Sequence, residues 1–418
     1  MPDTKIDNTA LASADPQLLG DPTADASKHL DTVRLREVAA TFLKLGAIGY
    51  GGPAIFGLFQ AELQERKKWL SKERFLEGLA LVHALPGAAA IQFCIFAGFQ
   101  RAGLWGGALA GLGFMLPGFA IMLALAVLHQ QFGGLPLMRH AFYGVAPVVV
   151  AIFIVATWRL GKTAIKDTTT AALAMAAAAA VYFTPLGVAG TLLFAGCVGL
   201  FMRHSRTLGL LWGAVVLALA GAEYLLHGTA AGMRLAAGAT AGSAGLLEIG
   251  SFFLKVGAVT FGGGITVLAF VQDQVVTQLH WITAQEFLDG LTLGQFTPGP
   301  ILMLAAFIGH KLQGVQGAAI AATAIFLPSF ILMLCILPVV ERFRKAQWVQ
   351  AAMGGISPAV VGVISVSFVQ LIPHAAPDLF TASLLLLTTA GLMRLKLPVV
   401  PLLLAGALIG VVAKAALP

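Results

Sequence analysis

Two lysines stand in apolar segments of the chain, and each precedes a sequence that breaks a helix. Lys44 lies in "FLKLGAIGYGGPAIFG" (42–57) and Lys255 in "FLKVGAVTFGGGITVLAF" (253–270), seven residues before the first glycine of the break. Because seven residues are about two helical turns, each ammonium group and its break lie along one helix face. A helix that restarts after a break directs free N–H groups and its positive dipole end at the gap, which favours anions. The residue types therefore indicate anion binding.

The chain has four such interruptions, each near the middle of a hydrophobic segment: Gly51-Gly52-Pro53, Gly262-Gly263-Gly264, Leu85-Pro86-Gly87 and Thr297-Pro298-Gly299-Pro300. Proline removes a backbone donor, and freed backbone groups in lipid cost several kcal/mol each, so breaks persist only inside protein or beside a polar cavity. One intramembrane proline is most often a packing kink, but four breaks at matched positions favour a binding site. The predicted substrate-binding residues are Lys44, Gly51, Gly52, Pro53, Pro86, Gly87, Gln92, Lys255, Gly262, Gly263, Gly264, Gln295, Thr297, Pro298 and Gly299.

The lysines have two interpretations. A lysine near the bilayer centre costs about 2.5–3.5 kcal/mol on insertion scales, so its retention in both halves points to function. In that case Lys44 and Lys255 would face each other across a pseudo-twofold axis and form a cationic site. Alternatively, each ammonium group extends to the membrane interface, since both lysines lie within two turns of the segment start.

Matched acidic residues are candidates for proton coupling. Glu37 and Glu248 precede the two lysines by seven residues, and Glu77 matches Asp289 near the second break of each half. They could bind protons or pair with cations, or the first two could mark the interface and the others could start helices. His83 could titrate near neutral pH, although a lone histidine is more often structural.

The elements that must position these residues are membrane-spanning helices. The 418 residues are 58% hydrophobic and 11% charged, with a mean hydropathy of +0.88. Repeated continuous apolar runs of near-spanning length predict an all-α polytopic integral membrane protein, whereas a β-barrel would show alternation. In such a protein the net charge of +7 marks cytoplasmic loops rather than nucleic-acid binding.

The chain repeats itself at a nearly constant offset. Lys44 matches Lys255 and "MLPGF" (115–119) matches "FLPSF" (326–330) at an offset of 211, while Pro86-Gly87 matches Pro298-Gly299 at 212. Duplication of this kind builds many transporters, which hold substrate between the repeats. We therefore predict a tail at 1–36, a first repeat at 37–205, a linker at 206–247 and a second repeat at 248–418. The tail is expected to be disordered and cytoplasmic.

Basic residues indicate that the two halves are inverted. The loop at 66–74 carries five Lys and Arg residues, whereas its counterpart at 271–285 carries none, and the bias reverses between 184–186 and the segment around Arg394. Loops of opposite bias at equivalent positions imply opposite orientations. The extra apolar segment 208–226, present once, supplies the odd transmembrane helix that inversion requires.

A count of the crossings suggests re-entrant segments. If 37–60, 75–100, 248–270 and 286–310 are broken hairpins that return to their own side, most of the 26 Lys and Arg residues fall on the cytoplasmic side. This assignment predicts nine spanning helices and four re-entrant hairpins with their breaks at the GGP, GGG and PG motifs.

Enzymatic signatures are missing from the sequence. It contains no Walker A loop, no HExxH motif, no nucleophile elbow and no Cys/His metal cluster. We therefore expect no enzyme activity, no cofactor and no metal site, and transport driven by gradients or membrane potential.

The motifs resemble the chromate ion transporter family over roughly residues 37–415. The resemblance rests on "FLKLGAIGYGGPAIFG" and "WLSKERFLEGLALVHALPG" in the first half and on "FGGG", "WITAQEFLDGLTLGQFTPGP" and "FLPSF" in the second. It implies a two-domain carrier of the bacterial inner membrane that exports chromate with the proton motive force and confers chromate resistance. Sulfate, a similar tetrahedral dianion, is the expected competitor, and association as a homodimer stays open.

The sequence departs from the family pattern at one break. Leu85-Pro86-Gly87 is followed by Ala88-Ala89-Ala90, where a second proline and a polar residue are expected, whereas the second half keeps "TPGP". This difference predicts an asymmetric site. It leaves open a carrier or exchanger of sulfate or another oxyanion, and inverted halves with re-entrant hairpins also permit an anion channel.

Overall fold

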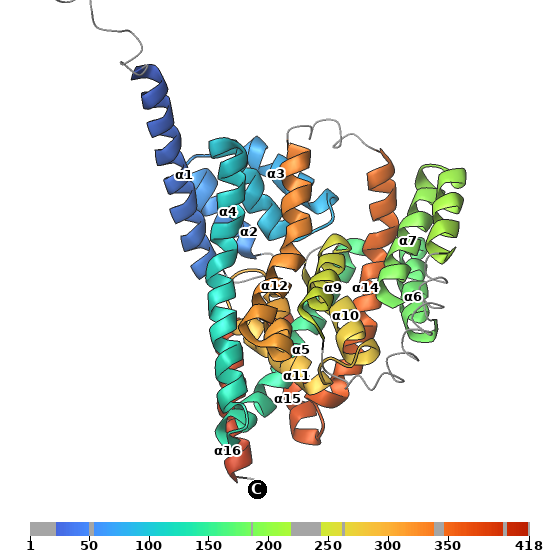
Figure 1. Cartoon of the computed structure of the whole chain (residues 1–418). Coiled ribbons are helices and arrows are strands. Elements are labelled where there is room, and N and C mark those ends of the chain that lie inside the picture. The colour runs from blue at the N-terminus through green and yellow to red at the C-terminus, as the bar shows by residue number, and fades with distance from the viewer. Residues whose placement is uncertain are drawn as a thin grey trace, which may run out of the picture.

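The computed structural model describes residues 22–49, 54–184, 187–218, 244–260, 264–337, 347–395 and 399–416, and this part of the chain is helical without strands (Figure 1). The first half comprises α1 (Pro22–Ile48), α2 (Ala54–Phe59), the π-helix η2 (Gln60–Arg66), α3 (Lys72–Ala84), α4 (Ala89–Phe132), α5 (Pro136–Ala164), α6 (Thr168–Phe183) and α7 (Gly187–Arg203). The second comprises α9 (Leu246–Ala258), α10 (Gly264–Gln272), the π-helix η3 (Asp273–Gln278), α11 (Ala284–Phe296), the short 3-10 helix η4 (Ile301–Met303), α12 (Leu304–Ile336), α14 (Gln347–Ala375), α15 (Leu379–Arg394) and α16 (Val399–Ala416). The order of elements thus repeats, π-helices included.

Four described helical stretches are long and apolar enough to cross a bilayer: Ala89–Phe132, Pro136–Ala164, Ile301–Ile336 and Gly354–Ala375. Shorter apolar helices accompany them at Thr168–Phe183, Gly190–Arg203, Arg206–Ala218, Leu379–Arg394 and Val399–Ala415. The predicted polytopic helical membrane fold is therefore confirmed. The predicted extra helix at 208–226 is described only in part, by Arg206–Ala218.

The first helix begins earlier than predicted. Residues 22–36 were assigned to the disordered tail, but α1 is continuous from Pro22 to Ile48. These residues are polar, so the hydropathy of the sequence did not predict a helix there. Polar helix formers continue a helix at little cost once the apolar portion, from Val38 onward, is packed.

Two glycines reverse the chain inside the longest helical stretches. Gly103 in α4 and Gly314 in α12 have φ angles of 62° and 59°. In α4 a Cβ on Gly98 would collide with the backbone carbonyl of Gly106, a contact that a straight helix could not make across this spacing. The residues before each reversal therefore form one arm of a hairpin, and those after it form the other.

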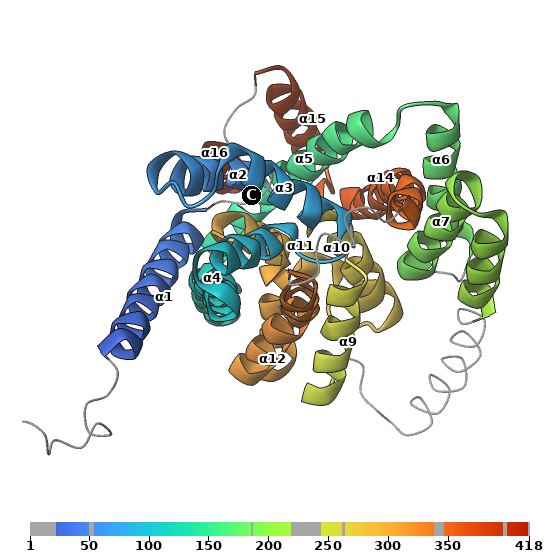
Figure 2. The same ribbon diagram turned by 90° about the horizontal axis from the view of Figure 1, so that it is seen from above.

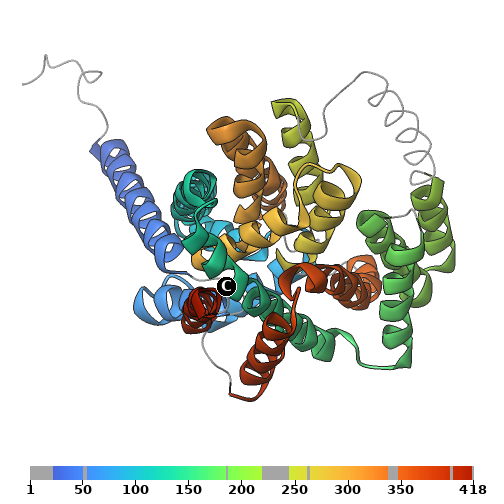
Figure 3. The same cartoon turned by 90° about the horizontal axis from the view of Figure 1, so that it is seen from below.

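The two repeats interlock. Helix α5 packs against α15 and α16, while its counterpart α14 packs against α6 and α7 (Figure 3). Equivalent glycines let these helices approach each other closely. The backbone of Gly144 in α5 contacts that of Gly410 in α16, and the backbone of Gly355 in α14 contacts that of Gly199 in α7. The sequence repeats are thus not separate bodies, because each supplies the packing partners of the other.

Polar contacts gather at two opposite ends of the molecule. At one end the Glu37 carboxylate bridges Lys67 and Arg101, at 3.1 and 2.9 Å. Lys67 follows the segment 37–60, and Arg101 follows the segment 75–100. Because both residues lie beside Glu37, each segment returns to the end of the molecule at which it starts. The equivalent segments of the second half approach the other end, near α11 and α15 (Figure 1). That they enter a bilayer from one side as re-entrant hairpins stays a prediction.

Matched N-caps begin the helices that follow α5 and α14. Asp167 and Asp378 each accept a hydrogen bond from the backbone N–H three residues on, at Thr170 and Thr381, and both form capping boxes. The hydrogen bonds from Thr170 hold the pKa of the Asp167 carboxyl below its usual value. The same local chemistry at the same register fixes where α6 and α15 start.

Candidate functional site

The breaks of the two halves are hydrogen-bonded to each other across the centre of the molecule. The Gly87 N–H donates to the Thr260 carbonyl at 2.6 Å, and the Gly299 N–H donates to the Gly49 carbonyl at the same distance. Thr260 and Gly49 are the last described residues before the glycine-rich breaks. Each proline-glycine break therefore contacts the glycine-rich break of the opposite half, and we call this arrangement the crossed breaks.

Backbone geometry explains why these motifs contain proline and glycine. Gly87 and Gly299 have φ angles of 126° and 97°, which side chains other than glycine rarely adopt. The residues Leu85 and Thr297, which end α3 and α11, are extended, in keeping with the preference of a residue that precedes proline. The helices restart at Ala89 and Ile301, immediately after the breaks.

Buried polar side chains surround the first proline-glycine break. The Gln92 amide Nε2 donates to the Pro86 carbonyl at 2.6 Å, and the Ser329 hydroxyl of α12 accepts from the Ala88 N–H at 2.9 Å. Both side chains are buried. The Gln92 Oε1 atom is buried and has no hydrogen-bond partner among the described residues.

The second proline-glycine break has a less polar environment. Leu304 takes the place of Gln92, and Gly118 takes the place of Ser329. Gly118 packs directly against the Pro298 carbonyl, where a Cβ would lie 2.6 Å from the oxygen. The predicted asymmetry is therefore present, although the polar groups belong to the first-half break and not to the half that keeps "TPGP".

In the described part of the chain, the hydrogen bonds at the crossed breaks join neutral groups. Helix α4 and the η4–α12 segment both begin there, and the first N–H groups of a helix have no partner within that helix. Such groups, aided by the positive end of the helix dipole, can replace the hydration of an anion. Gln92 and Ser329 add an amide and a hydroxyl to the same place.

The structure does not bring Lys44 and Lys255 together. Both side chains are exposed, on the faces of α1 and α9 that point away from α4 and α12. The views from above and below show α4 and α12 lying between α1 and α9 (Figures 2 and 3). The cationic site expected across the pseudo-twofold axis is therefore not seen in this conformation.

The remaining predicted binding residues are partly described. Gln295 is half-buried one turn before the second break, and Thr297 is buried with its hydroxyl bonded to the Leu293 carbonyl. Gly264 begins α10. The predicted residues Gly51, Gly52, Pro53, Gly262 and Gly263 lie outside the described part of the chain.

The predicted coupling residues occupy different environments. Glu37 joins Lys67 and Arg101, Glu77 pairs with Arg74 at 2.9 Å, and Asp289 pairs with His129 at 3.1 Å. Glu248 lies in the first turn of α9, and His83 lies in α3. Within the described part of the chain, no group of three His, Cys, Asp or Glu residues could hold a metal ion.

Sequence reasoning missed Ser329 and His129. The "FLPSF" motif marked the repeat, and its serine, opposite the glycine of "MLPGF", was the signal that could have identified Ser329. His129 had no such signal, because its partner Asp289 is 160 residues away in the chain.

Interlocked helical repeats whose broken helices meet at the centre define a class, the membrane transporters built from inverted repeats. The chain belongs to the chromate transporter family: the family model described as "Chromate transporter" matches residues 36–200 and 247–411. Both halves are thus matched separately, as the repeat of elements requires.

Curated relatives match over nearly the full length. A chromate transport protein from Cupriavidus metallidurans is 33% identical over 94% of this chain and 97% of its own. One from Pseudomonas aeruginosa is 34% identical over 90% of this chain and 91% of its own, and a probable one from Synechococcus elongatus is 30% identical over 90% and 95%. No solved structure matches the chain.

Proposed function

We propose that this protein is a secondary transporter that exports chromate from the cytoplasm across the bacterial inner membrane and thereby confers chromate resistance. The observation that carries the proposal is the pair of crossed hydrogen bonds, Gly87 to Thr260 and Gly299 to Gly49, which gathers the breaks of both halves. The printed names of the relatives, chromate transport proteins, supply the substrate.

The crossed breaks hold the anion in this proposal. A dianion that enters lipid must have its lost hydration replaced, and the first N–H groups of α4 and the η4–α12 segment do so without a counter-charge. Gln92 contributes hydrogen bonds through its amide group, and Ser329 contributes them through its hydroxyl. Neutral donors bind the anion less tightly than lysines would, which favours release.

The proton motive force drives export in this proposal. The N-terminus lies in the cytoplasm, together with the end of the molecule that carries Lys67 and Arg101, because basic residues are retained on that side. The proton gradient and the membrane potential both favour proton entry, and outward movement of chromate is coupled to it. The sequence contains no ATP-binding loop that could replace this source of energy.

Everted membrane vesicles test the proposal. Vesicles from a deletion strain that expresses the chain should accumulate radiolabelled chromate when respiration acidifies their interior, and vesicles from the same strain without the chain should not. Sulfate in excess should compete, because it presents the same tetrahedral dianion. Equal chromate accumulation in the two preparations, with the protein present in the membrane, would overturn the proposal. Sulfate uptake without chromate uptake would make the protein a sulfate carrier.

A further inference from the structure

A pocket of about 340 Å³ lies at the end of the molecule where α4 finishes and α5 begins. Its lining includes six polar residues from four helices: His129, Arg139, Tyr143, Gln285, Asp289 and His374. Four helices thus contribute polar side chains to this pocket. The pocket lies near the end of α4, whereas the crossed breaks lie at its start.

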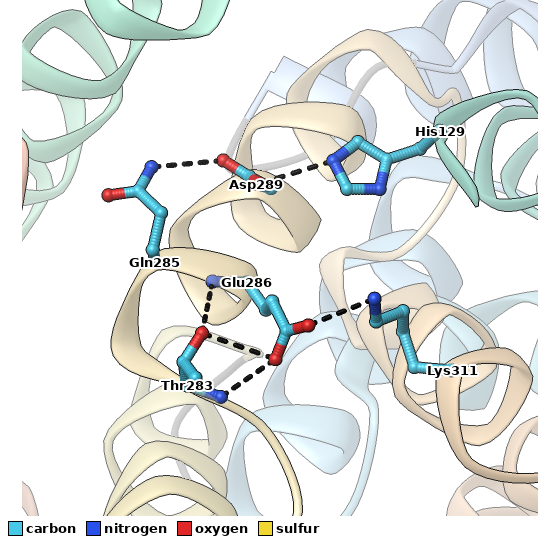
Figure 4. Close-up of polar contacts among 6 residues, drawn as sticks. All are labelled: His129, Thr283, Gln285, Glu286, Asp289 and Lys311. Carbon is cyan, nitrogen blue, oxygen red and sulfur yellow. Dashed lines mark hydrogen bonds and ion pairs between the residues drawn. The ribbon is translucent and has the colours of Figure 1, made fainter. Parts of the chain in front are cut away.

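His129 and Asp289 form a hydrogen-bonded pair in this wall and join the two halves. The His129 Nε2 lies 3.1 Å from the Asp289 Oδ2, and the Gln285 amide donates to the Asp289 Oδ1, also at 3.1 Å (Figure 4). The side chains of the pair are only 12% and 15% exposed. Phe142 and Phe307 pack against the imidazole, with ring centroids at 5.3 and 5.6 Å. The pair is therefore largely withdrawn from water although it borders a pocket.

The equivalent carboxylate of the first half has a different partner. Glu77, which matches Asp289, pairs with Arg74, and these side chains are 37% and 57% exposed. A guanidinium keeps its charge at any physiological pH, whereas an imidazole changes charge near neutral pH. Only the second-half pair thus combines a shielded carboxylate with a partner that can gain or lose a proton.

We propose that the His129–Asp289 pair is the proton-binding site that couples proton movement to anion transport; this inference rests on the proposed function. When the imidazole is uncharged, its Nε2–H donates to the Asp289 carboxylate and the pair carries one negative charge. The Nδ1 lone pair then accepts the proton, which gives an imidazolium–carboxylate pair with no net charge. The His129 Nδ1 is buried without a hydrogen-bond partner among the described residues. It therefore exchanges its proton in a conformation that opens this wall.

Proton binding at this pair can act on the crossed breaks because the pair spans the helices that carry them. Asp289 lies eight residues before Thr297, at which α11 ends in the second break, and His129 lies on α4, which starts at the first break. Charging the imidazole strengthens its bond to the carboxylate and so holds α11 against α4. Loss of the proton weakens that link and frees α11 to shift.

Other charged groups around the pair are known from the structure. Arg139 and Tyr143 of α5 and His374 of α14 line the same pocket. Tyr143 donates to Asp378 at 2.6 Å, and Lys414 lies over the Tyr143 ring. The adjacent Glu286 turns to Lys311 at 2.9 Å (Figure 4). Arg139 adds a positive charge to the pocket, so a second proton there is disfavoured.

The test separates coupling from transport itself. In everted vesicles, Asp289→Asn and His129→Gln should lower chromate accumulation driven by the proton gradient by about tenfold or more, a coupling effect of about 1.4 kcal/mol or larger. Exchange of internal for external chromate without a gradient should stay near the wild-type rate, because it needs no net proton movement. Asp289→Glu, which keeps a protonatable group, should retain part of the coupling.

Glu286→Gln provides the matched control on the same helix. It removes the charge that pairs with Lys311 but keeps a residue suited to the capping box with Thr283, so coupling should persist. Variants that accumulate chromate as the wild type does would overturn the inference and leave the proposed function intact. Variants that reach the membrane but lose exchange and accumulation equally would also overturn it, since the pair would then be structural. Absence of chromate flux in the wild type would instead refute the proposed function.

Discussion

The two halves repeat the same order of helices, but the side chains around their matching tryptophans make different contacts. In the first half Lys67 and Arg101 lie over the Trp69 ring, at 5.0 and 5.4 Å from its centroid, and both pair with Glu37. In the second half the matching Trp281 packs edge-on against Phe252 at 5.1 Å. The tryptophan of the first half thus lies beside two cations, and the matching tryptophan of the second half lies beside an aromatic ring. Inversion explains this difference, because equivalent ends face opposite sides of the membrane.

The side chains around the crossed breaks also differ between the two halves. At the Pro86-Gly87 break, Gln92 donates to the Pro86 carbonyl and Ser329 accepts from the Ala88 N–H. At the Pro298-Gly299 break, Leu304 stands at the position of Gln92, and the backbone of Gly118 packs against the Pro298 carbonyl. The backbone crossing is symmetric, but its side chains are not. The comparison teaches that the same backbone geometry can be kept with polar side chains at one break and without them at the other.

The largest effect is expected from Gly87→Ala. The new Cβ would be strained at a φ of 126°, would collide with the Gln92 amide and would come 2.5 Å from the Ser329 hydroxyl oxygen. Backbone strain alone costs about 1–3 kcal/mol, so chromate transport in everted vesicles should fall by about tenfold or more.

Two glycine variants sharpen that prediction. Gly299→Ala introduces strain at a φ of 97°, but its Cβ would lie 3.7 Å from the Gly118 Cα, which is ordinary van der Waals contact, so the loss of transport should be smaller. Gly314→Ala is the matched control, because it has a φ of 59° with open space around the Cβ and lies at the hairpin reversal. Equal losses in all three variants would mean that general destabilisation, and not the crossed breaks, controls transport.

Gln92→Leu makes the first break resemble the second. It removes the bond to the Pro86 carbonyl and the amide N–H donors that the proposal gives to the anion, which should cost about 1–2 kcal/mol, or about 5- to 30-fold in the KM for chromate. Initial uptake rates over a range of chromate concentrations give the KM. An unchanged KM, with normal amounts of protein, would show that the polar asymmetry has no part in binding.

Glu37→Gln tests the charged closure of the first half. It weakens the links to Lys67 and Arg101, but the Glu37 side chain is 36% exposed, so the loss should be about 1 kcal/mol or less. Thermal unfolding in detergent should show a small decrease in Tm, and the exposed neighbour Glu65 offers Glu65→Gln as the control. Identical Tm values for the two variants would refute a stabilising role for this closure.

The smallest effect is expected from Lys44→Gln and Lys255→Gln. Because both side chains are exposed and lie apart, chromate transport should stay within about twofold of the wild type. Vesicle uptake normalised to the amount of protein in the membrane measures this. A loss above tenfold in each variant would favour the cationic site that the sequence suggested.

Sequence reasoning recovered the fold because its signals are local and repeated. Breaks such as Pro86-Gly87 follow from backbone chemistry, and the offset of 211 exposes the duplication. The directions of Lys44 and Lys255 could not be predicted, because hydropathy does not say whether the polar face of a helix lines a site between helices or lies on the outside of the molecule. The start of α1 was missed because its first residues are polar and hydropathy does not mark them as helical.

The partners at the site could not be predicted from local patterns. Within one half nothing specifies that Gly87 bonds to Thr260 of the other half, since this pairing follows from the interlocking of the repeats. The same holds for the His129–Asp289 pair. Long-range contacts of this kind depend on how repeats pack and not on any single motif.

Anomalous scattering from chromium in crystals grown with chromate would test the central claim most directly. The predicted result is a peak beside the first residues of α4 and the η4–α12 segment, within hydrogen-bonding reach of Gln92 or Ser329. A peak located at Lys44 or Lys255, with none at the crossed breaks, would contradict the account.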